Sequence, residues 1–272
     1  MSEPTLLDRI LGPHGLSVVF QPIFQRHRTG WRLHALEGLV RGPHGTNMEG
    51  ADVLFEYVRR KHEETTVDRE CISRILLAAR ELPGAPRISV NVHASTLGRD
   101  GEFLPFMKAT LEKTGIPPSR LIIEIVEHSP YWDGEKFVRV LDGLRDIGVH
   151  IALDDVGLGQ SNYRMILECR PDYFKVDRYL VEGANADFYR RALLRSLTDL
   201  AGSFGAYAVA EGVATHDDLG TVVAEGFSLV QGFLLSKPLT LAVMKESDWL
   251  QDGDLDIAPV ERLPRRSIAV AV

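Results

Sequence analysis

The stretch VHIALDD, residues Val149 to Asp155, decides the fold. Its apolar centre, Ile151 to Leu153, is typical of a buried strand, and two adjacent carboxylates end that strand before the glycine-rich segment Gly157 to Gly159. α/β proteins bind ligands where buried strands deliver polar side chains to the loops at the carboxyl edge of a sheet. The alternative is a surface turn whose aspartates only cap the next helix. The rest of the chain favours the first interpretation.

Short apolar segments alternate with amphipathic segments along the chain. Strands are predicted at residues 17–24, 31–41, 87–92, 121–127, 149–155, 173–177, 207–212 and 228–232. Apolar residues at helical spacing predict helices at residues 50–60, 67–82, 103–113, 137–147, 187–204 and 215–225. About eight such alternations, without a linker between them, predict a single-domain α/β fold, a TIM-like (β/α)8 barrel. Pro22 in the first strand predicts an edge strand or a bulge.

The barrel is expected to occupy residues 16–250 of the chain. A lead-in helix precedes it in residues 1–15, and a tail follows it in residues 251–272. The tail has no place in the barrel, and its last residues either add a strand or stay mobile.

The composition is that of an ordinary globular protein, with 44% hydrophobic and 25% charged residues. The formal charge of −7 argues against DNA binding, which would require a basic face. No apolar run has the length of a membrane span, and the first residues do not resemble a signal peptide. Cys71 and Cys169 lack metal-ligand spacing, so both are expected to be reduced packing residues of a cytoplasmic protein.

Polar side chains accumulate at the ends of the predicted strands. They are Glu37, Asn91, Glu124, Asp154, Asp155, Lys175, Glu211 and Gln231. In a barrel these positions converge at one mouth, where the carboxylates require bound cations or raised pKa values. Oxygen donors without cysteine or histidine favour Mg²⁺ or Mn²⁺ over Zn²⁺. The adjacent Asp154 and Asp155 suit two ions that share a carboxylate, an arrangement that serves in-line displacement at phosphorus.

Eight motifs carry a family resemblance. They are QPI (21–23), LEGLVR (36–41), SVNV (89–92), EIVE (124–127), IALDDVGLGQS (151–161), DYFKVDR (172–178), AEGV (210–213) and QGFLLSKPL (231–239). In this order, from about residue 16 to 245, they resemble the EAL domain. The resemblance implies a phosphodiesterase that hydrolyses cyclic di-GMP to linear pGpG with two Mg²⁺ or Mn²⁺ ions. It also implies a barrel whose first strand is antiparallel to the others.

The resemblance further implies a role for each matching residue. One ion would be held by Glu37, Asn91, Glu124 and Asp154. The other would be held by Asp154, Asp155 and Glu211. Lys175 would position the attacking water or hydroxide, with support from Asp177. Substrate contacts would come from Gln21, Leu39, Arg41 and Gln231, and Glu127 would anchor the loop after Asp155.

Other polar and aromatic residues have two interpretations each. Asp68 would reach a guanine or would be an ordinary first-turn carboxylate favoured by the helix dipole. Phe233 would pack on a base or fill the barrel rim. Glu127 and Asp177 would serve the site or act as structural ion-pair partners. His34, His93 and His128 show no ligand spacing, and no role at the site is expected for them.

The motifs also depart from the family pattern. The tripeptide EAL is Glu37-Gly38-Leu39 here, which keeps the carboxylate. The loop usually written DDFGTGYSS is DDVGLGQSN, ELTE is EIVE, and EGVE is EGVA with Ala214 last. Since that loop is associated in the family with dimerisation and metal coupling, its changes bear on turnover and regulation. A homodimer is the assembly that the resemblance allows.

Two functions from different classes follow. The first is an active phosphodiesterase, since every position that matches a metal ligand is filled. The second is a module that binds cyclic di-GMP without turnover, because the loop from Val156 to Asn162 has changed. A phosphohydrolase acting on another nucleotide is a more remote third.

Overall fold

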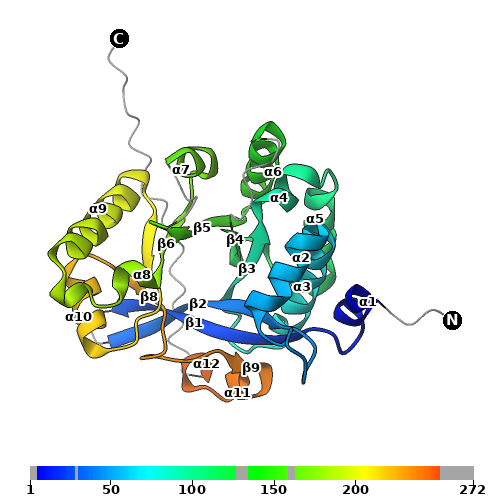
Figure 1. Cartoon of the computed structure of the whole chain (residues 1–272), viewed down its shortest axis with the longest axis horizontal. Helices are drawn as coiled ribbons and strands as arrows, with labels where there is room; N and C mark the ends of the chain where they lie inside the picture. The colour runs from blue at the N-terminus through cyan, green and yellow to red at the C-terminus, as the bar shows by residue number, and fades with distance from the viewer. Residues whose placement is uncertain (1–4, 28–29, 127–133, 159–162, 252–272) are drawn as a thin grey trace, which may run out of the picture.

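The chain folds around a nine-stranded sheet that closes on itself (Figure 1). The computed structural model describes residues 5–27, 30–126, 134–158 and 163–251. The strands are β1 (Ser17–His27), β2 (Gly30–Arg41), β3 (Arg87–His93), β4 (Leu121–Val126), β5 (His150–Val156), β6 (Tyr173–Val176), β7 (Tyr207–Ala210), β8 (Leu229–Val230) and β9 (Leu239–Thr240). The helices are α1 (Leu6–Leu11), α2 (Ala51–Lys61), α3 (Glu64–Ala79), α4 (Ala94–Arg99), α5 (Phe103–Thr114), α6 (Gly134–Asp146), α7 (Tyr163–Cys169), α8 (Arg178–Val181), α9 (Phe188–Phe204), α10 (His216–Ala224), α11 (Leu241–Lys245) and α12 (Asp248–Gln251).

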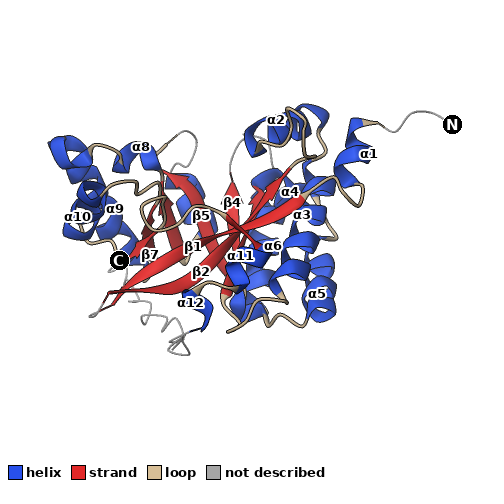
Figure 2. Ribbon diagram, turned by 90° about the horizontal axis from the view of Figure 1, so that it is seen from below, coloured by secondary structure: helices blue, strands red, loops and turns tan. Residues whose placement is uncertain are grey.

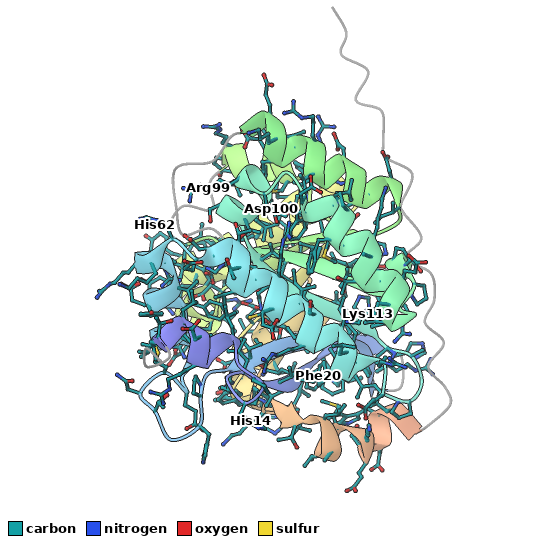
Figure 3. The ribbon with its side chains drawn as sticks, turned by 90° about the vertical axis from the view of Figure 1, so that its right-hand side faces the viewer. His14, Phe20, His62, Arg99, Asp100 and Lys113 are labelled. Carbon is teal, nitrogen blue, oxygen red and sulfur yellow. The ribbon has the colours of Figure 1, made fainter. Side chains whose placement is uncertain are left out.

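Strand order confirms the predicted barrel. Strands β2 to β8 lie side by side in chain order and are all parallel. Strand β1 runs antiparallel between β8 and β2 and closes the barrel, as the resemblance implies. The short β9 is an additional strand on β1. Helices surround the strands (Figure 2). Figure 3 shows the side of the barrel that carries Asp100, the residue after the end of α4.

Pro22 interrupts β1 where the strand needs no second partner. On the side away from β2, Val19 and Phe20 pair with β9, whereas Phe24 and Gln25 pair with β8. Pro22 lies between these two short pairings, and the register against β2 shifts just beyond it. A residue without an N–H is tolerated at such a position. Of the two predicted alternatives, the edge-like position describes Pro22, since the bulge itself lies one residue further along, between Ile23 and Phe24.

Capping residues set the ends of the helices. Asp187 accepts hydrogen bonds from the backbone N–H groups at the start of α9, and Gly205 ends that helix with a φ of 68°. Thr215 and Asp218 form a reciprocal capping box at the start of α10. These side chains satisfy backbone donors that have no partner within the helix. The predicted bounds of both helices agree with the structure to within one residue.

Apolar side chains pack on both faces of the sheet. Inside, one cluster is formed by Ile23, Ala35, Ile122, Ala152, Tyr173, Val209 and Leu229. Outside, a much larger cluster packs the strands against the helices. The free thiols of Cys71 and Cys169 are buried in this outer cluster, which confirms that they are packing residues. No helix in the described part of the chain combines the length and apolar character needed to cross a bilayer.

Asp68 is not the first-turn carboxylate that the sequence suggested. Helix α3 begins at Glu64, one turn earlier than predicted, so Asp68 lies inside the helix with 2% of its surface exposed. Its carboxylate accepts hydrogen bonds from the backbone N–H of His93, from His93 Nδ1 at 2.9 Å and from Thr96 Oγ1 at 2.6 Å. These contacts fix α3 to the end of β3 and the start of α4. In this arrangement the Asp68 carboxylate is a structural group.

We expect Asp68→Asn to lower the free energy of unfolding by about 3 kcal/mol near pH 6, because a buried pair loses one partner. Although burial opposes protonation of His93, the Asp68 carboxylate raises the pKa of His93 above its usual value. The stabilisation that the charged His93–Asp68 pair gives the folded protein is complete below the usual histidine pKa of about 6.5. It is lost as the pH rises through the higher pKa of His93 in the folded protein. Urea unfolding across this range measures it.

The matched control for this prediction is Asp52→Asn, which changes an exposed carboxylate in the first turn of α2. Removing the Asp52 charge should lower the free energy of unfolding by no more than about 1 kcal/mol. Equal losses in the two variants would contradict the structural role of Asp68.

Candidate active site

Lys175 lies at the centre of a group of buried and half-buried carboxylates at one mouth of the barrel. Its Nζ is 2.5 Å from Glu124 Oε2 and 2.7 Å from Glu211 Oε1. It is 3.4 Å from Glu37 Oε2 and 3.5 Å from Asp154 Oδ1. Four strands or strand ends supply these carboxylates, and β6 supplies the lysine. The predicted convergence of strand-end side chains is what the structure shows.

Two amide side chains hold the Glu37 carboxylate. Asn91 Nδ2 donates to Glu37 Oε1 at 2.8 Å, and Gln231 Nε2 donates to Glu37 Oε2 at 2.6 Å. The carbonyl oxygens Asn91 Oδ1 and Gln231 Oε1 are buried, and neither has a hydrogen-bond partner among the described residues. Buried carbonyl oxygens normally have a partner. Asn91 Oδ1 is therefore an oxygen donor available to a ligand of this site.

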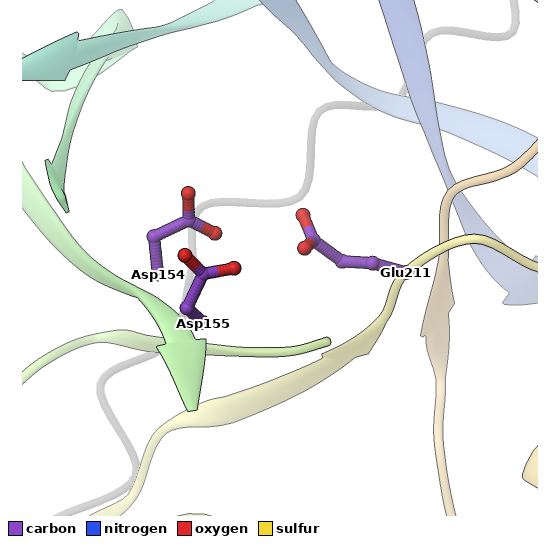
Figure 4. Close-up of side chains that lie close together, drawn as sticks. All are labelled: Asp154, Asp155 and Glu211. Carbon is purple, nitrogen blue, oxygen red and sulfur yellow. The ribbon is translucent and has the colours of Figure 1, made fainter. Parts of the chain in front are cut away.

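Asp154, Asp155 and Glu211 form a second group of oxygens (Figure 4). One carboxylate oxygen from each lies within 4.8 Å of the others. Adjacent residues of a regular strand point to opposite faces, but Asp155 has a φ of 52°, and the pairing of β5 with β6 is irregular between Leu153 and Val156. This left-handed residue turns the second carboxylate towards the same side as the first. Such conformations cost energy and persist at functional sites.

Burial makes most of these carboxylates hard to ionise. It raises the pKa of Glu124 to about 8, and the neighbouring Glu37 carboxylate adds to the effect. Burial, Asp154 and the nearby Asp177 raise the pKa of Asp155 to about 6. Burial also raises the pKa values of Asp154 and Glu211. Full ionisation of the group would therefore place more negative charge there than its surroundings can stabilise.

Glu37 and Lys175 are the ionised pair within this group. Burial opposes ionisation of Glu37, but Lys175 and the amides of Gln231 and Asn91 outweigh it and lower the pKa of Glu37. Burial likewise opposes the charge of Lys175, but Asp154 and the other carboxylates raise the pKa of Lys175 well above its usual value. One ammonium group serves at least four carboxylates, which leaves excess acidic oxygens to accept a further cation.

The donor set fits hard divalent cations. It contains carboxylate oxygens and the amide oxygen of Asn91, without a cysteine or histidine ligand among the described residues of the group. Mg²⁺ and Mn²⁺ prefer these oxygen donors. A cation would also remove the repulsion that raises the carboxyl pKa values. The structure thus brings all the predicted ligands to one mouth of the barrel.

The predicted substrate contacts lie around the same mouth. Gln21 faces Glu37 across the β1–β2 pair and donates to the carbonyl of Ser236 at 3.3 Å. Leu39 and Arg41 are half-buried at the end of β2, where Arg41 Nη1 donates to its neighbour Val40. Phe233 is 61% exposed and lies 5.7 Å from Lys237 Nζ, so it does not fill the barrel rim.

Three further predictions have mixed outcomes. Asp177 caps α8 by accepting from the backbone N–H of Tyr179 at 2.7 Å, and it also lies beside Asp155. The predicted strand to residue 127 ends at Val126, and Glu127 lies outside the described residues. His34 and His93, which lack ligand spacing in the sequence, each form a buried side-chain hydrogen bond.

A model of the family described as EAL domain matches residues 7–238. The chain belongs to the EAL domain family. Among its relatives, the cyclic di-GMP phosphodiesterase NbdA of Pseudomonas aeruginosa is 29% identical over 267 residues, which are 96% of this chain and 33% of NbdA. The cyclic di-GMP phosphodiesterase PdeL of Escherichia coli is 29% identical over 87% of this chain and 66% of PdeL. The present EAL domain therefore spans about a third of the length of NbdA.

Solved structures share the fold of this EAL domain. A calcium and cyclic di-GMP complex of Klebsiella pneumoniae BlrP1 superposes with a TM-score of 0.74 and 24% identity, over 88% of this chain and 58% of that one. The cyclic di-GMP-bound form of a standalone EAL protein from Vibrio cholerae O395 has the same TM-score and 23% identity, over 85% and 94% of the two chains. These similarities confirm the TIM-like barrel.

The glycine in the EGL tripeptide has a structural explanation. A Cβ at Gly38 would lie 2.2 Å from Ile75 Cγ2 and 3.2 Å from Ile75 Cβ. Ile75 is buried on α3, and a β-branched side chain in a helix has one strongly preferred χ1 rotamer. In this EAL domain, α3 approaches β2 so closely beside Glu37 that only glycine fits. The departure from the family alanine is therefore matched by Ile75.

We expect Gly38→Ala to destabilise the protein by about 1–3 kcal/mol, although it restores the family residue, because it overpacks this contact. Adding Ile75→Leu should recover part of the loss, since leucine lacks the Cγ2 methyl that the new Cβ meets. Adding Ile75→Val should not, since valine keeps that methyl. Urea unfolding of the single and double variants measures the coupling. Additive losses with leucine would show that Ile75 does not explain the glycine.

Proposed function

We propose that this EAL domain is a metal-dependent phosphodiesterase that hydrolyses cyclic di-GMP to linear pGpG. The observation that supports it most strongly is the convergence of Glu37, Asn91, Glu124, Asp154, Asp155 and Glu211 around Lys175. Such a density of buried and half-buried carboxylates weakens a fold unless cations or a reaction use it. The named phosphodiesterase relatives support the choice of substrate.

Two groups of oxygens would hold two Mg²⁺ or Mn²⁺ ions. Glu37, Asn91, Glu124 and Asp154 would hold one, and Asp154, Asp155 and Glu211 the other, so that Asp154 is shared. When bound, such ions supply Lewis-acid stabilisation of the charge on phosphate oxygens and help to activate water. Gln231 supports this role indirectly, because its amide keeps Glu37 ionised and oriented.

The remaining polar residues would orient the reactants. Lys175 keeps its proton and donates hydrogen bonds, so it would hold the attacking water in line with the scissile P–O bond. Arg41, at the end of β2, would donate to a phosphate oxygen through its planar guanidinium. Gln21, Leu39 and Phe233 would contact the nucleotide at the rim. Asp177 would support the second group of oxygens through its position beside Asp155.

A cyclic di-GMP receptor without turnover is the second candidate. It is favoured by the changed loop after Asp155, where Val156 and Leu158 replace the family Phe and Thr. The two candidates share the binding site and differ in whether product forms.

Cellular context forms a further part of the proposal. The free and buried thiols of Cys71 and Cys169 support action in the cytoplasm. Exposed apolar side chains, among them Tyr163 on α7 and Phe188 and Tyr189 on α9, support a homodimer, since large exposed apolar groups often mark interaction surfaces.

Purified protein with Mn²⁺ should convert cyclic di-GMP to pGpG, as measured by chromatography of the nucleotides. Lys175→Ala should bind the nucleotide but turn it over about 10²–10⁴-fold more slowly, because it loses a group that acts on the nucleophile. Lys245→Ala, which removes a surface lysine paired with Glu81, is the matched control and should retain full activity. Binding without product in the wild type would refute the enzyme and leave the receptor.

Mn²⁺ affinity should rise with pH, because the ligands must lose their protons to bind a cation. With the pKa of Glu124 near 8 and that of Asp155 near 6, protons compete with the ion at neutral pH. Below the pKa of Glu124, each proton that must leave lowers the Mn²⁺ affinity by about tenfold for each unit by which the pH falls. Titration calorimetry in buffers of different ionisation enthalpy should detect proton release near pH 7. An affinity independent of pH between about 6 and 9 would contradict the ligand set.

A further inference from the structure

A hydrogen bond crosses the barrel interior below the carboxylates. His34 on β2 and Tyr173 on β6 form it, with 3.1 Å between His34 Nε2 and the tyrosine hydroxyl. On the other side of the ring, His34 Nδ1 lies 3.3 Å from Gln25 Oε1. His34 and Tyr173 are both buried, with 7% and 2% of their surfaces exposed. The proposed reaction gives neither residue a direct role.

A β-bulge turns His34 into the barrel. Side chains of a regular strand point to its two faces in turn. Since Glu37 points into the barrel, regular alternation along β2 would place Leu36 and His34 on the outer face. The register against β1 instead passes from Ala35 opposite Ile23 to Leu33 opposite Phe24, which leaves His34 as the extra residue. Ala35 belongs to the inner apolar cluster, whereas Leu33 and Leu36 belong to the outer one. Bulges redirect side chains in this way near functional sites.

The chemical groups around His34 determine which atoms donate and which accept in its two hydrogen bonds. Gln25 Oε1 only accepts, so His34 Nδ1 carries the ring proton and Nε2 accepts from the Tyr173 hydroxyl. Burial and the charge of Arg87 lower the pKa of His34 to about 3. Burial raises the pKa of Tyr173 above its usual value. The imidazole therefore stays neutral and the phenol stays protonated over the working pH range, which keeps the bond intact.

The two strands that this bond joins also carry Glu37 and Lys175. His34 precedes Glu37 by three residues, and Tyr173 precedes Lys175 by two on the same inward face of β6. Strands β2 and β6 are not neighbours, because β3, β4 and β5 lie between them, so no backbone ladder sets their distance across the barrel. The hydrogen bond and the Glu37–Lys175 pair are two direct side-chain links between these opposite strands.

A small cavity separates the bond from the charged site. Its volume is about 10 Å³, and its lining includes His34 and Tyr173 as well as Glu124 and Lys175. Apolar side chains, among them Ile122 and Val209, form its wall. Tyr173 and Lys175 therefore border the same small space, which is about the size of one water molecule.

We propose that His34 and Tyr173 are positioning residues, whose hydrogen bond across the barrel sets the separation of Glu37 and Lys175. The inference rests on the proposed function, because it assigns these residues to the geometry of the cation and nucleophile site. The bond acts through the backbone of β2 and β6 and touches no reactant. It explains why the chain places a buried polar pair in an otherwise apolar layer of the barrel.

Tyr173→Phe tests the proposal, because it removes only the hydroxyl. Tyr207→Phe is the matched control, since the Tyr207 ring stacks on Tyr173 at 5.8 Å but its hydroxyl forms no hydrogen bond with any described residue. We expect Tyr173→Phe to weaken Mn²⁺ binding and lower kcat by about tenfold or more, with a smaller change in KM. Tyr207→Phe should leave all three unchanged. Titration calorimetry and steady-state kinetics measure these effects, and the unfolding midpoint checks stability.

Changes at His34 provide the second measurement. His34→Gln keeps a hydrogen-bonding group and should retain more Mn²⁺ affinity than His34→Leu. Combining His34→Leu with Tyr173→Phe should add little to the single changes, because either one already breaks the bond. Mn²⁺ affinity decides the proposal even if the wild type binds cyclic di-GMP without hydrolysing it. Equal Mn²⁺ affinities for Tyr173→Phe and Tyr207→Phe would overturn it.

Discussion

The burial of one ammonium group among several carboxylates is the constraint on which the site depends. Lys175 is 2% exposed and lies within 3.5 Å of four acidic side chains. Desolvation of these groups is costly, and only their mutual attraction and the amides around Glu37 offset it. The closed sheet helps to hold the arrangement, because Glu37, Glu124 and Lys175 lie within strands that pair with a neighbour on each side. The same imbalance of charge makes the site ready to accept cations.

Much of this architecture can be predicted from the sequence, because the spacing of apolar residues distinguishes strands from helices. Apolar runs spaced by amphipathic helices predict the barrel, and polar residues at strand ends predict the mouth where they meet. Glu37, Glu124 and Lys175 stand out since charged residues have no structural reason to interrupt apolar strands. The family motifs then supply the order of the strands and the antiparallel direction of the first. For these residues local pattern and tertiary position agree.

Other features depend on contacts that no local pattern reveals. The interior position of Asp68 follows from the start of α3 one turn earlier, which the buried Glu64 allows. The inward orientation of His34 requires a bulge in the register, and alternation alone predicts the opposite face. The fit of Gly38 depends on Ile75, a residue of another element. The left-handed Asp155 likewise results from the irregular pairing of β5 with β6.

The antiparallel direction of β1 determines where the chain enters the barrel. Ser17, the first residue of β1, pairs with Arg41 at the carboxyl end of β2, so the entry point lies on the ligand-binding side. Arg74 of α3 fastens the approaching segment by donating to the carbonyls of Gly12 and Leu16 at 2.6 and 2.7 Å. The segment before β1 is therefore joined to α3, the helix that packs against Gly38 beside Glu37. The inverted strand thus brings the lead-in segment, α3 and the Glu37 end of β2 into one connected part of the barrel.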